Sequence, residues 1–155
     1  MQVHNDVYPA DPAQLQSLME KGPSGPIFMV NLLKFKDKAE YEDGRETSLT
    51  GREAYNIYGR AVTALLPAFG GRAVFAADVT LLSLGRVEEL WDEIAIAAYP
   101  ERAAMVRMSM SPEWREMSVH RTAGLKGQLN IESVLTPDMT PDWLVRIAAE
   151  VGSGS

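Results

Sequence analysis

The stretch that decides the fold is Pro26–Lys36, PIFMVNLLKFK, in which a single asparagine interrupts an apolar run. Because a strand places alternate side chains on opposite faces, this run has two apolar faces. One face carries Ile27, Met29, Asn31, Leu33 and Phe35, and the other carries Phe28, Val30 and Leu32. A strand of this kind is covered on both sides. An unpaired amide costs about 1–3 kcal/mol in such a position, so we expect Asn31 to have hydrogen-bond partners.

Capping residues and apolar stripes predict five helices around this strand. Thr50 and Glu53 form a T-x-x-E capping box, and glycines at 70 and 71 end the helix that it starts. The other helices are marked by a polar residue or a proline at the start. They begin at Pro12 after Asp11, at Pro100, at Pro112 after Ser111, and after Thr140-Pro141.

Three further strand regions complete the pattern: an interrupted strand covering 72–78 and 80–84, and strands at 90–98 and 122–135. The charged segment 37–48 reads as an exposed loop. The core order is therefore βαββαβ, which predicts an α+β, ferredoxin-like antiparallel sheet with helices on one face. Helices are added at both ends. We expect one domain over residues 1–151, and residues 152–155 resemble a linker or tag.

The apolar patterning also predicts assembly. The predicted strands at 26–36 and 90–98 are apolar on both faces, whereas one layer of helices covers only one. A second copy of the same sheet is the simplest cover for the other face. We therefore expect a homodimer.

Composition limits the classes of function. The chain has 155 residues, a net charge of −6, no cysteine and two histidines. The acidic charge without a basic patch argues against nucleic acids and anionic membranes as partners. Thiolate chemistry and a histidine-based metal cluster are excluded, so we expect no metal and no cofactor. We see neither a secretory signal nor an apolar run of about 20 residues, and therefore expect a cytoplasmic protein.

Several segments together resemble one family: VNLLKF, GREAYNIYG, GG, LWDEIAIAAYPER, SPEW and HRTAGL, from about Asp11 to Leu129. They resemble the DUF1330 family, a branch of the dimeric α/β-barrel superfamily. The resemblance implies a ferredoxin-like subunit that pairs sheet to sheet as a homodimer. The superfamily contains cofactor-free monooxygenases, cyclases, isomerases and lyases as well as haem-binding branches, so the fold does not select a reaction. Met105 and Trp114 replace an expected aromatic residue and an expected tyrosine, which changes the pocket expected there.

Four polar residues are candidates for chemistry. Asn31 either satisfies its neighbours or donates a hydrogen bond to a substrate oxygen. Asp92 is either paired with Lys34, Arg102 or Arg121, or is a general base. His120 is either structural or a general acid–base, and Arg121 is either a structural bridge or the anchor for an anionic group.

Four larger side chains are candidates for the wall of a substrate pocket: Tyr55, Tyr58, Trp91 and Met108. The tyrosines lie three residues apart on one helical stripe, where their hydroxyls line any pocket between helix and sheet. Methionine suits an adaptable apolar pocket, although such stripes are also ordinary core.

These residues favour a cofactor-independent enzyme that acts on a small organic metabolite. Acid–base or oxyanion chemistry would place it among lyases, isomerases, cyclases or oxygenases. The alternative is a non-catalytic, small-molecule-binding or structural homodimer. Haem binding through His120 is a third and weaker hypothesis. An open cavity reached by at least three of Asn31, Tyr55, Asp92, His120 and Arg121 would favour the enzyme.

Overall fold

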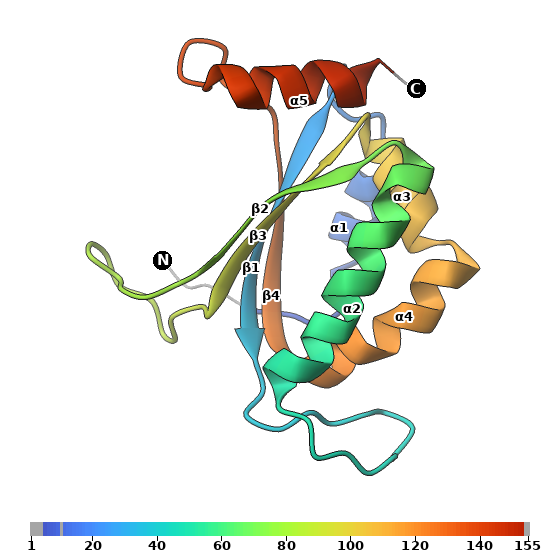
Figure 1. The fold of residues 1–155 in the computed structure, drawn as a ribbon, viewed down its shortest axis with the longest axis vertical. Helices are drawn as coiled ribbons and strands as arrows, with labels where there is room; N and C mark the ends of the chain where they lie inside the picture. The colour runs from blue at the N-terminus through green and yellow to red at the C-terminus, as the bar shows by residue number, and fades with distance from the viewer. Residues whose placement is uncertain (1–4, 10, 154–155) are drawn as a thin grey trace.

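The computed structural model of the protein describes residues 5–9 and 11–153 (Figure 1). Four strands form the sheet: β1 Ile27–Phe35, β2 Arg72–Asp78, β3 Glu93–Tyr99 and β4 Leu125–Ser133. The helices are α1 Pro12–Met19, α2 Gly51–Leu65, α3 Arg102–Ser109, α4 Pro112–Gly124 and α5 Asp142–Gly152, with a 3₁₀ turn at Leu66–Phe69.

The sheet has the strand order β2-β3-β1-β4, and every neighbouring pair is antiparallel. Strand β1 lies in the centre, and the register places Asn31 between Ala95 of β3 and Asn130 of β4. Since the chain order is βαββαβ with α2 and the α3–α4 pair as the crossovers, the predicted α+β, ferredoxin-like fold is confirmed.

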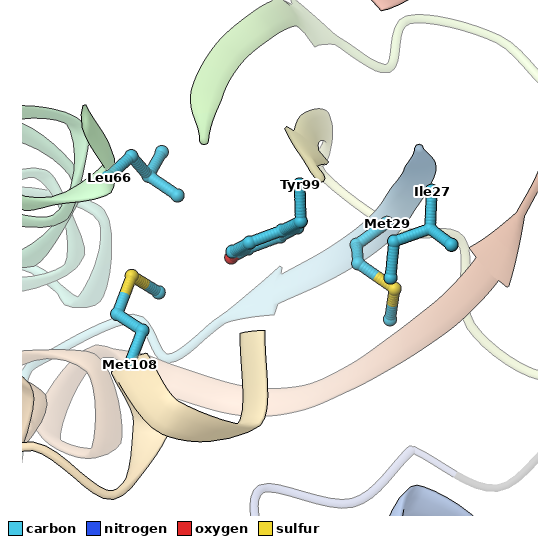
Figure 2. Packing of buried hydrophobic residues seen from close by; sticks show 5 residues of the cluster. All are labelled: Ile27, Met29, Leu66, Tyr99 and Met108. Carbon is cyan, nitrogen blue, oxygen red and sulfur yellow. The ribbon is translucent and has the colours of Figure 1, made fainter. Parts of the chain in front are cut away.

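Helices α2, α3 and α4 cover one face of the sheet (Figure 1). At one end of this layer Ile27 and Met29 pack with Leu66, Tyr99 and Met108. Figure 2 shows the Tyr99 ring between the two strand residues and the helical Leu66 and Met108, with its hydroxyl directed away from the strand residues. At the other end of β1, a second cluster contains Leu33, Phe35, Tyr55, Tyr58 and Leu125.

The opposite face of the sheet is covered only at one end, where α5 packs across it (Figure 1). Phe28 and Ala98 form a cluster there with Val151 of α5. Further along the same face Phe75 and Ile131 are 48% and 47% exposed. The face that the sequence predicts to be apolar is therefore only partly buried within one chain.

Helix α2 begins as the sequence predicts and meets α4 at two glycines. Thr50 Oγ1 accepts a hydrogen bond from Glu53 N at 3.1 Å, and Glu53 Oε2 accepts one from Thr50 N at 2.7 Å, which completes the capping box. A Cβ atom on Gly51 would lie 2.6 Å from the carbonyl oxygen of Gly124 and 2.1 Å from that of Lys36. Only glycine permits this approach of α2 to α4 and β1.

Several boundary predictions are wrong. Residues 122–124, predicted as strand, form the end of α4, and the strand predicted at 90–98 begins only at Glu93. Residues 80–84 form no strand, and the chain leaves the sheet at Asp78 and returns at Glu93. Thr140 does not cap α5, because its hydroxyl donates to the carbonyl oxygen of Thr136 at 2.7 Å. Helix α3 begins at Arg102 rather than at Pro100.

The domain boundary at residue 151 and the tail at 152–155 stay predictions. Helix α5 continues to Gly152, and the tail residues 154–155 lie outside the described residues, as do residues 1–4 and 10. Within the described ranges, no helix is long and apolar enough to cross a membrane.

The contact between Gly51 and Gly124 generates a stability prediction. Gly51→Ala should lower the free energy of unfolding by about 1–3 kcal/mol or more, because the methyl group overlaps backbone oxygens that cannot move independently. Gly59→Ala, in the same helix, has no atom within 4 Å of the new Cβ and should raise stability by up to about 1 kcal/mol. Urea unfolding of both variants measures the difference. Equal effects would contradict a close helix contact.

Candidate functional site

An open cleft of about 1500 Å³ lies between the helix layer and the sheet. It runs beneath α2, from the N-terminal segment and α1 beside β4 to the gap between α2 and β2. Its floor has small side chains on the helix-facing side of β2 and β3: Ala73, Ala76, Ala95 and Ala97. Alanine leaves volume under the helices that a larger side chain would fill.

Asn31 lies on the cleft side of β1, and all of its hydrogen-bonding capacity is used. Its Nδ2 donates to the carbonyl oxygens of Met29 at 3.3 Å and Ala95 at 3.1 Å. Its Oδ1 accepts from Gln128 Nε2 and from Asn130 Nδ2, both at 2.6 Å. An amide has two donors and two acceptor lone pairs, so no donor remains for a ligand. Asn31 fixes the orientation of two other polar side chains on the cleft wall.

Arg121 continues this network from α4. Its Nη2 donates to Gln128 Oε1 at 2.6 Å and to the carbonyl oxygen of Val7 at 3.0 Å, which ties the N-terminal segment to the edge of the sheet. The side chain lines the cleft, and Nε and Nη1 have no acceptor among the described residues. A guanidinium has five N–H donors, so several remain for a ligand.

Aromatic residues form the helical wall of the cleft. Tyr55 and Tyr58 of α2 lie 5.4 Å apart between ring centroids, and Trp114 of α4 packs edge-on against Tyr58. Trp114 Nε1 donates to the hydroxyl of Tyr58 at 3.1 Å. Tyr99 of β3 lines the same cleft from the sheet.

The hydroxyl protons of these three tyrosines have no acceptor within residues 5–9 and 11–153. Burial raises the pKa of Tyr55, Tyr58 and Tyr99, so all three stay protonated at neutral pH. No fully buried side-chain nitrogen or oxygen lacks a partner in the described part of the chain. The hydroxyls of Tyr55 and Tyr99, which have no partner, are therefore not fully buried and line the cleft. Several donors are left free on the cleft wall.

Five of the eight predicted site residues line this cleft: Asn31, Tyr55, Tyr58, Met108 and Arg121. Three of them belong to the five polar candidates whose convergence on a cavity favours an enzyme. Trp91 does not line the cleft, because its Nε1 donates to Asn5 Oδ1 at 2.7 Å on another part of the surface.

Asp92 and His120 also lie outside the cleft. Asp92 pairs with Lys34 Nζ at 3.1 Å and accepts from Phe35 N at 2.9 Å, so of its predicted alternatives the ion pair with Lys34 is present. His120 Nδ1 lies 2.7 Å from the hydroxyl of Tyr41 in the 37–48 loop. Burial and the charge of Arg45 lower the pKa of His120. Neither group is near the cleft donors.

Other cleft residues escaped the sequence analysis. Gln128, Asn130 and Glu132 lie on the helix-facing side of β4, opposite Leu33, Asn31 and Met29. The sequence contains a pattern that could have identified them, since polar residues alternate with Leu129 and Ile131 along β4. In an ordinary strand covered by helices, the apolar residues would face the helices, whereas here the polar ones do. Tyr99 of β3, directly before Pro100, is a further cleft residue that the sequence analysis does not single out. Among the described residues, no group of three His, Cys, Asp or Glu could hold a metal ion.

The saturated amide of Asn31 generates a second prediction. Asn31→Leu should lower the free energy of unfolding by about 1–3 kcal/mol, because Gln128 loses the acceptor for its half-buried amide. Asn130→Ala removes the other, exposed partner and should have a smaller effect, because water replaces its hydrogen bond. Denaturant titration of both variants tests this order. A neutral Asn31→Leu variant would mean that the amide network does not contribute to stability.

No curated protein matches the chain. A crystal structure of the RPA0582 protein of unknown function from Rhodopseudomonas palustris has 32% sequence identity and a TM-score of 0.75, covering 86% of this chain and all of that one. The methylated RPA0582 protein has 34% identity and a TM-score of 0.76, with 87% and 98% covered. A dimeric, ferredoxin-like protein of unknown function from Bacteroides fragilis is 12% identical, with a TM-score of 0.48 and 71% and 96% covered.

The family model covers most of the strands and helices that build the cleft. The model of the domain of unknown function (DUF1330) matches residues 44–133, from the loop before α2 to the end of β4. This segment holds most of the cleft wall, including the tyrosines of α2, the arginine of α4 and the polar face of β4. The chain belongs to the DUF1330 family.

Proposed function

We propose that the protein is an enzyme that binds a small organic molecule in the cleft and stabilises negative charge on one of its oxygen atoms. The observation that carries this proposal is the group of hydrogen-bond donors left without an acceptor on the cleft wall. The hydroxyls of Tyr55, Tyr58 and Tyr99 and two nitrogen positions of Arg121 have no acceptor among the described residues. A ligand that satisfies them carries a carboxylate or a carbonyl group.

The apolar side chains of the cleft wall indicate what the rest of the ligand would be. Met105 and Met108 of α3 and Trp114 of α4 line the cleft beside the tyrosines. Methionine and aromatic side chains suit a flat or irregular apolar group. The substrate class is therefore a small, largely apolar molecule with one acceptor-rich end.

The proposed chemistry is of the oxyanion type. Phenol and guanidinium donors aimed at an oxygen on which charge develops lower the barrier, and removing one such donor costs on the order of 10²–10³ in rate. The chain's own side chains supply these donors, so we propose a cofactor-independent lyase, isomerase, cyclase or oxygenase. Asn31 takes a positioning role, since it holds Gln128 against Arg121 and has no free donor.

Non-catalytic binding of the same class of ligand is the second candidate. The complete pairing of Asn31 and the positions of Asp92 and His120 outside the cleft favour it. The sequence predicts that Asn31 donates to a substrate oxygen and that Asp92 or His120 moves a proton, and these contacts leave neither role open in the cleft. If carbonyl compounds bind in the cleft and none of them is converted to a product, non-catalytic binding is favoured over the enzyme.

We also propose that the functional unit is a homodimer, built on the face of the sheet that α5 leaves open. Phe75 and Ile131 are half-exposed there, and Val30 and Ile96 lie on the same face by register. Two such sheets packed face to face would bury these side chains and form a dimeric α/β barrel. The clefts would then lie on the outer sides of the two sheets.

The anchoring role of Arg121 gives a binding prediction. Arg121→Gln should weaken the binding of phenylacetate, an apolar carboxylate used as probe, by about tenfold or more, since hydrogen bonds to charged groups contribute about 1.5–3 kcal/mol. Arg107→Gln is the control, because Arg107 is exposed on α3 and outside the cleft. Chemical-shift titration by NMR measures both affinities. Equal affinities for the two variants, or no binding to the unchanged protein, would contradict the proposed function.

The dimer proposal has its own test. Ile131→Lys introduces a charge into the open face of the sheet and should convert the dimer into a monomer, because the charge would have to be buried without a partner. Ile57→Lys is the control, because Ile57 is also an exposed isoleucine but lies on α2, on the helical side of the sheet. It should leave the dimer intact. Analytical ultracentrifugation distinguishes the two states. A monomeric unchanged protein at micromolar concentration would refute the assembly.

A further inference from the structure

The cleft also contains a carboxylate, on the other side of β1 from Gln128. Glu93 lies at the start of β3 on the helix-facing side, opposite Leu33, and lines the cleft. Its side chain is only 15% exposed. Asp78, which binds the same arginine as Glu93 (Arg52), is 70% exposed. Glu93 is therefore a half-desolvated acid inside the proposed substrate site.

One arginine holds Glu93 in place without saturating it. Arg52 Nη1 donates to Glu93 Oε2 at 3.0 Å and also to Asp78 Oδ1 at 2.8 Å, so one nitrogen is shared between two carboxylates. The guanidinium carbon lies 4.7 Å from the centroid of the Phe35 ring, which fixes its position. Oε1 of Glu93 has no hydrogen-bond partner among the described residues. A carboxylate oxygen accepts about two hydrogen bonds, so it is available to accept a proton.

Tyr55 lines the same cleft as this carboxylate and the proposed anion anchor. Burial raises the pKa of Tyr55 most, while the charge of Arg121 lowers it and that of Glu93 raises it. A molecule whose carboxylate binds Arg121 would occupy the cleft that Tyr55 and Glu93 also line. Burial also raises the pKa of Glu93, opposed by Arg52, which gives the carboxylate a stronger attraction for a proton than an exposed glutamate has.

We propose that Glu93 is the general base of the cleft and removes a proton from the carbon next to the carbonyl group of an oxo acid. This inference rests on the proposed function. The Glu93 carboxylate accepts the proton, and the electron pair of the broken C–H bond forms the C=C bond of an enolate. The carbonyl π electrons move to oxygen, and the Tyr55 hydroxyl donates a hydrogen bond to that oxygen. Return of a solvent-derived proton from Glu93 to the same carbon exchanges its hydrogen, and protonation of the oxygen gives the enol, with no oxidant or reductant.

The test uses the full chain and phenylpyruvate, which has an anionic end, a carbonyl, an acidic C–H and an apolar ring. Proton NMR in D₂O follows loss of its methylene signal after the protein-free rate has been subtracted. Glu93→Gln should lower the protein-catalysed exchange by about 10²–10⁴-fold, the usual contribution of a general base. Glu116→Gln is the matched control, because Glu116 is exposed on α4 and lies outside the cleft. It should exchange at nearly the rate of the unchanged protein.

A second measurement does not depend on the variant folding. In the unchanged protein enriched with ¹³C at the glutamate carboxyls, Glu93 should titrate above 4.5, the ordinary glutamate value. The exchange rate should rise with pH through the same midpoint, since the base acts when deprotonated. A midpoint at or below 4.5, or normal exchange in Glu93→Gln, would overturn the proposal. Phenylpyruvate that binds without exchanging would also overturn it and leave the binding function intact. Failure of the probe to bind would contradict the proposed function itself.

Discussion

The site depends on the small side chains that β2 and β3 present to the helices. The helix layer is anchored at one end where Gly51 meets Gly124 and at the other where Leu66 and Met108 pack against Tyr99. These contacts hold the helices at a fixed distance from the sheet, and alanines between them cannot fill the space. An open volume therefore persists in the middle of a layer that is well packed at both ends. Larger residues on the floor would turn the cleft into ordinary core.

Within this cleft, the balance of hydrogen bonds separates structural from available polar groups. Asn31 has four partners, so its amide organises the wall without offering anything to a ligand. The tyrosines and Arg121 retain unused donors at the cleft surface. Buried donors without acceptors are costly, and a ligand oxygen is the natural way to satisfy donors that open onto a cavity. The difference between these groups is one of local contacts rather than of residue type.

The two faces of the sheet differ in what covers them. The cleft occupies the helix-facing side, whereas the open apolar side is available for assembly. Because side chains alternate along each strand, a residue such as Ile131 serves one face while its neighbour Asn130 serves the other. Helix α5 covers one end of the open face, where Val151 packs against Phe28.

The sequence by itself determined the secondary elements, their order and the two faces of β1, because caps, glycines and period-two alternation act between residues close in the chain. It also predicted that Asn31 needs partners. Only the tertiary structure decided which partners, because Gln128 and Asn130 are about one hundred residues away and reach Asn31 through strand register. The same long-range contacts moved Asp92 and His120 out of the site and brought Glu93 into it. Adjacent residues such as Asp92 and Glu93 have nearly the same local sequence, and the position at which β3 begins decides which carboxylate enters the cleft.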